Sequence, residues 1–204
     1  MKYGFSIGIK IYRKLLNNMN EQITKKKKIL FICDDIRFFS GIAVMARELV
    51  MGTIHKYDFC VLAGSVKRPE AGKVIDMSPA AKAQTGIQDA YLRLYPTDGY
   101  GNEESLMAIM NIEKPDALLF LTDPRYFVWL FQLERQIRDK IPMIYWTVWD
   151  NLPYPMWNNS FYQSCDTLLG FSKQSDNIHK WTLRPENCIS IDGEFDTLGN
   201  LIKE

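Results

Sequence analysis

The stretch from residue 141 to residue 177 repeats one pattern twice, an apolar run followed at once by polar residues. The runs cover residues 143 to 148 and residues 167 to 171, and each has the length of a strand buried on both faces. Polar residues follow both runs: Asp150 and Asn151 after the first, Ser172 and Lys173 after the second. Because ligands bind at the carboxyl ends of strands in an open α/β sheet, these four residues are candidate site residues.

The same alternation of apolar runs and helical segments extends along the chain. We expect strands at residues 29–33, 58–63, 91–94, 117–121, 143–148, 167–171 and 188–191. Helices are expected at residues 42–54, 103–112, 126–138 and 175–182, within 156–165, and near 80–85. This order predicts an α/β protein with a doubly wound, mostly parallel sheet and helices on both faces.

Three parts of the chain differ in composition. Residues 1–27 form an arm rich in basic and apolar residues, residues 28–191 form the predicted domain, and residues 192–204 form a polar tail. A basic amphipathic arm can lie on an anionic membrane surface or dock on a partner. A packing extension or a loosely ordered terminus is the alternative that we favour for residues 1–24.

Composition excludes several classes of function. Of the 204 residues, 47% are hydrophobic and the net charge is +1, so a nucleic-acid partner is not expected. The chain has four cysteines without a C-x-x-C pair and two isolated histidines, His55 and His179, so neither a zinc site nor a redox motif is indicated. No apolar run reaches the length of a membrane span, and we expect a cytoplasmic protein, with the arm as the one candidate contact to the inner membrane face.

Polar residues also follow the strands at 29–33 and 117–121. Asp34, Asp35 and Asp123 are acids of the kind that hold magnesium in phosphoryl-transfer receivers. The segment between Asp35 and Asp123 is too long for a receiver, so we interpret Asp34 as a cap or loop residue. Ser40 and Gly41 precede a helix, where they form either a phosphate cradle or a plain tight turn.

Three segments together resemble one enzyme family. They are residues 28–43, with a strand and a small-residue loop, residues 114–124, which read Lys-Pro-Asp and then an apolar strand, and residues 141–177. The ensemble, over roughly residues 28 to 180, is similar to the N-terminal, acceptor-side domain of GT-B-type glycosyltransferases (glycosyl transferase group 1, family 4-like). The resemblance implies a Rossmann-like domain and transfer of a hexosyl group from a nucleotide-sugar to an acceptor.

The resemblance also implies roles for individual residues. Asp150 is the candidate catalytic residue, close to the transferred sugar, with a loop-cap role as the alternative. The family frequently carries histidine at the position of Trp149, whose indole can instead stack on a sugar ring. Ser40 and Gly41 would lie beneath the donor pyrophosphate. Candidate substrate-binding residues complete the set: Asp123, Asn151, Tyr154, Ser172 and Lys173.

Some of these residues have simpler interpretations. Lys173 can meet a phosphate, whereas Ser172 more simply caps the next helix. Six aromatic residues surround the Asp150 loop: Trp146, Trp149, Tyr154, Trp157, Phe161 and Tyr162. We expect about two-thirds of them to pack in the core, with Trp149 and Tyr154 the candidates for exposure.

A complete GT-B enzyme also needs a donor-binding domain. We expect this chain to be the first part of a longer enzyme, a subunit that pairs with a donor-binding protein, or a catalytically inactive domain that binds carbohydrate or protein. Its ligands would be a sugar acceptor and a nucleotide-sugar co-substrate. Neither a cofactor nor a metal is expected, because the family relies on helix dipoles and basic side chains at the leaving diphosphate.

Overall fold

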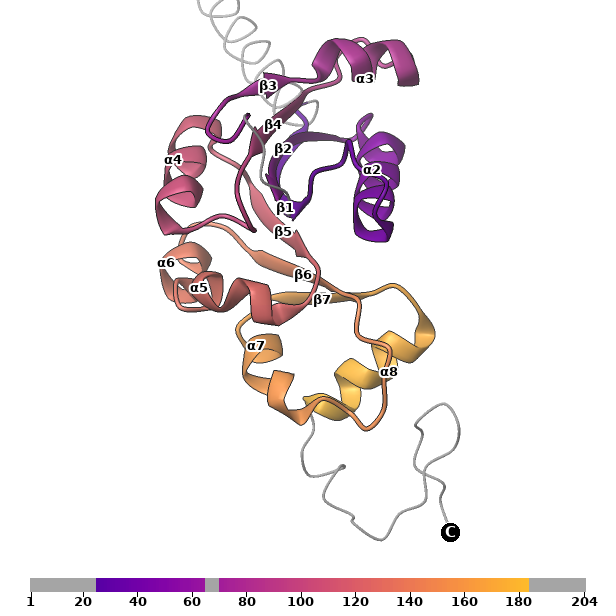
Figure 1. The fold of residues 1–204 in the computed structure, drawn as a ribbon, viewed down its shortest axis with the longest axis vertical. Helices are drawn as coiled ribbons and strands as arrows, with labels where there is room; N and C mark the ends of the chain where they lie inside the picture. The colour runs from indigo at the N-terminus through magenta and orange to yellow at the C-terminus, as the bar shows by residue number, and fades with distance from the viewer. Residues whose placement is uncertain (1–24, 65–69, 184–204) are drawn as a thin grey trace, which may run out of the picture.

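A seven-stranded sheet with helices on both faces forms the fold (Figure 1). The computed structural model describes residues 25–64 and 70–183. Residues 1–24, the tail 192–204 and the strand predicted at 188–191 lie outside the described residues. Of the predicted arm, only residues 25–27 are described, and Lys27 already belongs to the first strand.

Six strands run parallel: β1 (Lys27–Asp34), β2 (Tyr57–Gly64), β4 (Leu92–Pro96), β5 (Ala117–Leu121), β6 (Met143–Thr147) and β7 (Thr167–Gly170). The short strand β3 (Ile75–Asp76) pairs antiparallel with β4 at one edge. The order is β3-β4-β2-β1-β5-β6-β7. Without β3 this is the 3-2-1-4-5-6 order of a doubly wound, Rossmann-like sheet, so the predicted fold class is confirmed.

Helices cover the two faces in separate layers (Figure 1). One layer holds α4 (Glu103–Glu113), α5 (Val128–Phe131), α6 (Glu134–Arg138) and α7 (Asn159–Gln163). The other holds α2 (Gly41–Thr53) and α3 (Ser78–Thr85), while α8 (Lys173–Thr182) packs on β7. Two apolar cores result, one on each face of the sheet.

Alternation along β1 explains why there are two cores. Leu30 and Ile32 point into the core beneath α4, and Phe31 and Cys33 into the core beneath α2. All four are fully buried. A strand that is apolar on both faces therefore marks the centre of a parallel sheet, as predicted from its continuous apolar run.

Most predicted elements are found within a few residues of their expected bounds, with two differences. The helix predicted at 126–138 is three pieces, η1 (Pro124–Phe127), α5 and α6. The backbone leaves the helical region at Phe127, with φ −112° and ψ 17°, and at Leu133, with φ −97° and ψ 4°, so the helix is interrupted at both. The segment predicted within 156–165 likewise begins as η2 (Met156–Asn158) before α7.

No helix within residues 25–64 and 70–183 is both long and apolar enough to span a bilayer. The run Lys25 to Lys28 is instead largely engaged in the domain. Lys26, Lys27 and Lys28 form ion pairs with Asp89, Asp116 and Glu113 at N to O distances of 2.8, 2.7 and 2.7 Å. These lysines tie the start of β1 to the amino-terminal edge of the sheet.

Candidate functional site

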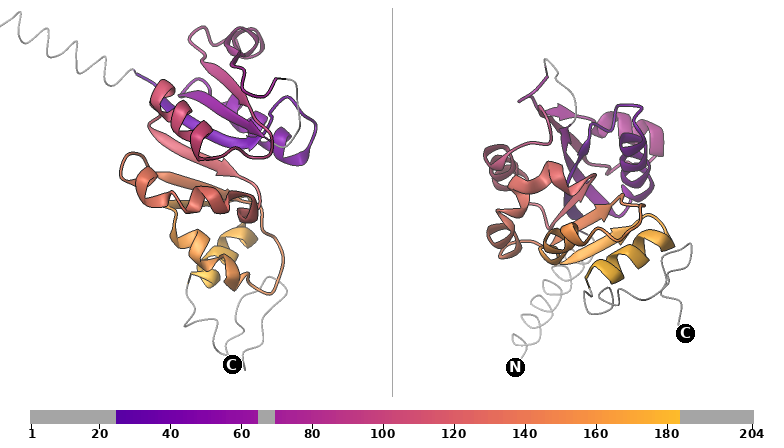
Figure 2. Two further views of the ribbon diagram at one scale, coloured as in Figure 1. Left: turned by 60° about the vertical axis from the view of Figure 1, so that its left-hand side comes forward. Right: turned by 60° about the horizontal axis from the view of Figure 1, so that its bottom comes forward.

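The sheet has one topological switch point, between β1 and β5. The chain builds β1, β2 and β4 toward one edge, then returns to place β5, β6 and β7 on the other side of β1. Neighbouring loops diverge at such a point and leave a crevice at the carboxyl ends of the strands. The loops after β1, β5 and β6 lie together at the same end of the parallel strands (Figure 2, left). The candidate site is therefore at this carboxyl-terminal edge.

A cavity of about 250 Å³ opens after β5 and β6. Its lining is mixed polar and aromatic, and consists of Asp123, Pro124, Arg125, Tyr145, Val148, Trp149, Asp150 and Asn151. Four of these were predicted site residues, namely Asp123, Trp149, Asp150 and Asn151. The structure thus brings together predicted residues from two neighbouring strand ends.

Asp123 is held by Arg125. Its Oδ1 accepts hydrogen bonds from the backbone N of Arg125 at 2.9 Å and from its Nε at 2.8 Å, and Oδ2 accepts one from Nη2 at 2.6 Å. The side-chain hydrogen bond from Arg125 lowers the pKa of Asp123 despite partial burial. Asp123 therefore caps η1, and its carboxylate forms an ion pair with the exposed guanidinium of Arg125.

Asp150 differs from Asp123 because its carboxylate has no hydrogen-bond or ion-pair partner within the described ranges. Its backbone oxygen accepts a hydrogen bond from Gln174 Nε2 at 2.9 Å, which fixes the loop to the start of α8. Trp149 donates from Nε1 to the backbone oxygen of Asn151 at 3.1 Å and contacts Trp157 edge to face at 5.8 Å. The cap alternative for Asp150 has no side-chain hydrogen bond to support it.

A second group of polar side chains lies at the end of β1. Asp34 is only 5% exposed. Its Oδ2 accepts a hydrogen bond from Ser40 Oγ at 2.5 Å, and its Oδ1 accepts one from Tyr100 Oη at 2.6 Å. Burial, and then the hydrogen bond to Asp34, raises the pKa of Tyr100, so this phenol stays protonated and donates. Both partners are uncharged.

Ser40 also caps α2, because its Oγ accepts a hydrogen bond from Ala43 N at 3.0 Å. A Cβ added at Gly41 would meet no atom within 4 Å, so space is open above the first turn. A phosphate in that space would lie beside the Asp34 carboxylate. Of the two interpretations of Ser40 and Gly41, the geometry favours the turn.

The neighbouring acid, Asp35, is engaged differently. It is 2% exposed and binds the Arg37 guanidinium through both oxygens, at 2.9 Å to Nε and 2.6 Å to Nη2. Arg37 also contacts Glu70 at 2.8 Å. Among the residues that the structure describes, no three His, Cys, Asp or Glu side chains are grouped to hold a metal ion.

Sequence reasoning missed two residues of the crevice. Tyr100 reaches Asp34 from the loop after β4, where it stands between Gly99 and Gly101, both at positive φ. Thr122, next to Asp123, has a φ of 136°, which is strained for a β-branched residue. A tyrosine between two glycines was the available signal for Tyr100, while nothing in the sequence marked Thr122.

The remaining predicted residues lie at the edge of the site or outside it. Tyr154 was expected to be exposed, and this was wrong, because it is 8% exposed and stacks on Trp181 at 5.9 Å. Ser172 caps α8 by accepting from Ser175 N at 3.2 Å, which confirms the simpler interpretation. Lys173 is exposed at the start of α8.

The six aromatic residues around the Asp150 loop divide four to two between packing and exposure, in the proportion expected but with one member of the exposed pair different. Four pack in the protein: Tyr154, Tyr162, Trp146 and Phe161. Trp149 is partly exposed. The second exposed aromatic residue is Trp157, at 60%, and not Tyr154 as predicted. The aromatic surface of this loop is thus made of two tryptophans.

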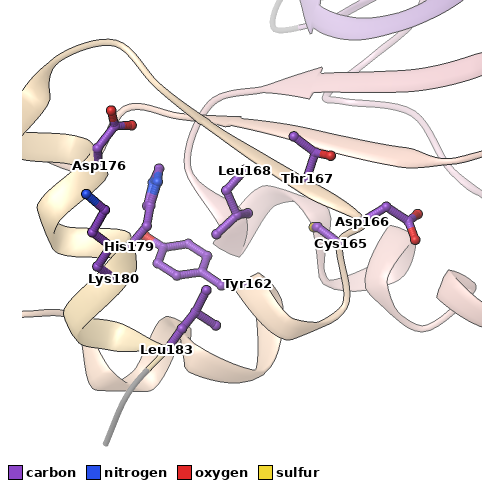
Figure 3. Close-up of a pocket in the computed structure, with 9 residues that line it drawn as sticks. All are labelled: Tyr162, Cys165, Asp166, Thr167, Leu168, Asp176, His179, Lys180 and Leu183. Atoms are coloured by element: carbon purple, nitrogen blue, oxygen red, sulfur yellow. The ribbon is translucent and has the colours of Figure 1, made fainter. Parts of the chain in front are cut away.

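A larger cavity, about 420 Å³, lies away from the switch point between α7, β7 and α8 (Figure 3). His179 and Tyr162 point toward its centre, and Lys180 lies on α8 at its rim. His179 Nε2 shares a hydrogen bond with Thr147 Oγ1 at 2.5 Å, and burial lowers its pKa. Burial raises the pKa of Cys165 to about 12, so its thiol is a poor nucleophile. We therefore take the crevice at the switch point, and not this cavity, as the candidate site.

Comparisons with protein-family models, curated proteins and solved structures find no match to this chain. The fold is therefore established by the sheet order and the helix layers. The chain contains a Rossmann-like α/β domain whose crevice carries carboxylates, an amide and indoles.

Proposed function

We propose that this chain binds the sugar acceptor in a glycosyl transfer, as the acceptor-side domain of a GT-B-type glycosyltransferase. One observation carries the proposal, the cavity after β5 and β6 that is lined by Trp149, Asp150 and Asn151. Carboxylate and amide oxygens accept hydrogen bonds from sugar hydroxyls. An indole offers an apolar face for the C–H side of a sugar ring.

Within this proposal Asp150 holds a hydroxyl of the acceptor. Its carboxylate is exposed and has no partner within residues 25–64 and 70–183, so a ligand hydroxyl has no internal donor to displace. Its position is fixed through the Gln174 hydrogen bond to its backbone. A carboxylate placed against an attacking hydroxyl can take its proton as a general base.

The charge of the crevice supports an uncharged acceptor over a phosphate. Asp34 has only hydroxyl partners, and the Asp150 carboxylate has none within residues 25–64 and 70–183, so no cation is paired with either acid there. The donor diphosphate is then expected to bind to a second domain or a partner subunit, which would complete the enzyme. The chain alone would not turn over.

A catalytically inactive carbohydrate-binding or protein-binding domain is the second candidate. The observation that favours it is Trp149, which stands where the family frequently carries histidine. A stacking indole is compatible with binding but does not transfer a proton.

Calorimetry of the full chain with neutral oligosaccharides and, separately, nucleotide-sugars tests the proposal. We expect binding of at least one neutral oligosaccharide, weakened about tenfold by Asp150→Ala and by Trp149→Ala. Asp139→Ala removes an exposed carboxylate after α6 and is the matched control. Binding of no sugar would contradict the proposal, as would sugar binding that neither variant changes.

A further inference from the structure

Large apolar side chains are exposed around the crevice. Eleven such side chains are exposed among the described residues, and seven follow β1, β5, β6 or β7 at the carboxyl-terminal edge. We call these seven the apolar rim: Phe39, Tyr126, Val128, Leu152, Met156, Trp157 and Phe171. The other four are spread over the rest of the described surface.

The residues of the apolar rim follow four neighbouring strands. β1, β5, β6 and β7 are adjacent and parallel, and three spacings of about 4.8 Å separate the first from the last by roughly 14 Å. Phe39 is 93% exposed and directly precedes Ser40, while Trp157 lies against Trp149 of the cavity. The rim therefore borders the crevice from both sides.

Such a collection of exposed side chains marks an interaction surface. Solvent-exposed apolar residues are ordinarily scattered singly, and grouped ones bind partners. Phenylalanine, tyrosine, tryptophan and methionine, which make up most of the rim, are the residues enriched in protein interfaces. Phe39 is 93% exposed, so its burial would remove more apolar surface from water than the burial of any other residue in the rim.

Charge at the same edge indicates which partner fits. Four carboxylates there form no ion pair within the described residues: Asp98, Asp150, and Glu103 and Glu104 in the first turn of α4. The cations are fewer. Arg37 and Arg125 are already paired with acids, and Arg47 binds the carbonyl oxygens of Ile36 and Phe38. Two exposed lysines, Lys73 and Lys173, have no acidic partner within the described residues.

An acidic edge repels an anionic membrane and attracts a basic protein surface. We propose that the apolar rim and these carboxylates form a docking surface for a second polypeptide whose contacting face carries basic side chains among apolar ones. The bound polypeptide covers the crevice. The inference goes beyond sugar binding and holds whether or not the crevice takes a sugar.

Two synthetic amphipathic peptides with one leucine pattern, one carrying lysines and one glutamates, test the proposal by fluorescence anisotropy with the full chain. We expect the lysine peptide to bind at least about tenfold more tightly than the glutamate peptide. Phe39→Ser and Trp157→Ser should each reduce that affinity about tenfold. Ile112→Ser, which changes a 66% exposed residue of α4 away from the rim, should leave it unchanged.

Equal affinity for the two peptides would overturn the proposal, as would rim variants that behave like Ile112→Ser. Sedimentation with vesicles of phosphatidylcholine and phosphatidylglycerol provides the second measurement. We expect that the apolar rim does not bind the chain to these vesicles, so Phe39→Ser and Trp157→Ser should not change how much of the chain sediments with them. Vesicle binding that Phe39→Ser and Trp157→Ser abolish would assign the rim to a membrane instead. If the chain binds the lysine peptide but no neutral oligosaccharide in calorimetry, the proposed function is contradicted and the docking surface is not.

Discussion

Two carboxylates are buried at opposite edges of the same sheet, and their partners differ. Glu113, at the amino-terminal edge, is 4% exposed and forms an ion pair with Lys28 at 2.7 Å. Asp34, at the carboxyl-terminal edge, is 5% exposed and has only the hydroxyls of Ser40 and Tyr100. The first acid is paired with a cation, whereas the second has only hydroxyl partners beside the crevice.

The pKa of Glu113 records this pairing with a cation. Burial opposes its ionisation, but hydrogen bonds from Lys28, Tyr95 and Tyr91 outweigh burial and lower the pKa to about 2. Removing one partner of a buried ion pair is strongly destabilising, while a buried acid without a cation is a candidate functional group. From this comparison we expect Glu113 to matter for stability, and the proposed function expects Asp34 to matter for ligand selection.

Removal of the Glu113 side chain should have the largest effect on stability. Glu113→Ala leaves Lys28 without its counterion and two tyrosines without an acceptor, and should lower the free energy of unfolding by about 3 kcal/mol. Urea denaturation measures it. Asp89→Ala, which breaks the exposed pair with Lys26, is the control and should cost less than about 1 kcal/mol. Equal losses of unfolding free energy in Glu113→Ala and Asp89→Ala would contradict the larger contribution expected of the buried acid.

Acid should weaken the same edge. Because the pKa of Glu113 is lowered on folding, its contribution is complete above the ordinary glutamate pKa near 4.3 and is lost as the pH falls toward about 2. The free energy of unfolding should therefore fall more steeply over this range in the wild type than in Glu113→Gln. Identical slopes in urea denaturation at each pH would contradict the assignment.

Removal of one hydroxyl from Asp34 should have a smaller effect. Tyr100→Phe leaves the buried Oδ1 of Asp34 without its donor and should cost about 1.5 kcal/mol. Tyr126→Phe is the matched control, because Tyr126 is 58% exposed and contacts Tyr100 through its ring. If Tyr100→Phe is as stable as the control, the hydrogen bond to Asp34 does not hold the loop after β4.

Neutralisation of Asp34 should change binding more than stability. Asp34→Asn should leave the free energy of unfolding within about 1 kcal/mol, because no cation loses a partner. It should increase the affinity of the full chain for inorganic pyrophosphate about tenfold, since the first turn of α2 then faces no carboxylate. Asp139→Asn controls for net charge. A wild type that binds pyrophosphate as tightly as Asp34→Asn would show that Asp34 does not exclude anions.

The sequence allowed prediction of what depends on local pattern. Apolar runs located the six parallel strands, and polar residues after two of them placed Asp123 and Asp150 in one cavity, because neighbouring parallel strands end at one edge. The two-residue β3 was too short to leave a pattern. The alternation of strands and helices predicted a doubly wound sheet, but the strand order came from the structure.

Contacts between distant segments could not be predicted. Tyr100 reaches Asp34 across 66 positions of the sequence, and no local pattern encodes that pairing. Tyr154 is buried where α8 brings Trp181 against it, although prolines flank it on both sides in the sequence. Four of the eight residues that line the cavity were thus predictable from the sequence, whereas the contacts between distant segments were not.

Amide chemical shifts of the full chain during titration with a neutral oligosaccharide test the central claim most directly. The account predicts shifts at the carboxyl-terminal edge, in residues 122, 123, 125 and 149–151, and none at Lys28, Tyr91 or Glu113. Shifts confined to the amino-terminal edge or to the cavity of Figure 3 would contradict it, as would the absence of shifts with every neutral oligosaccharide.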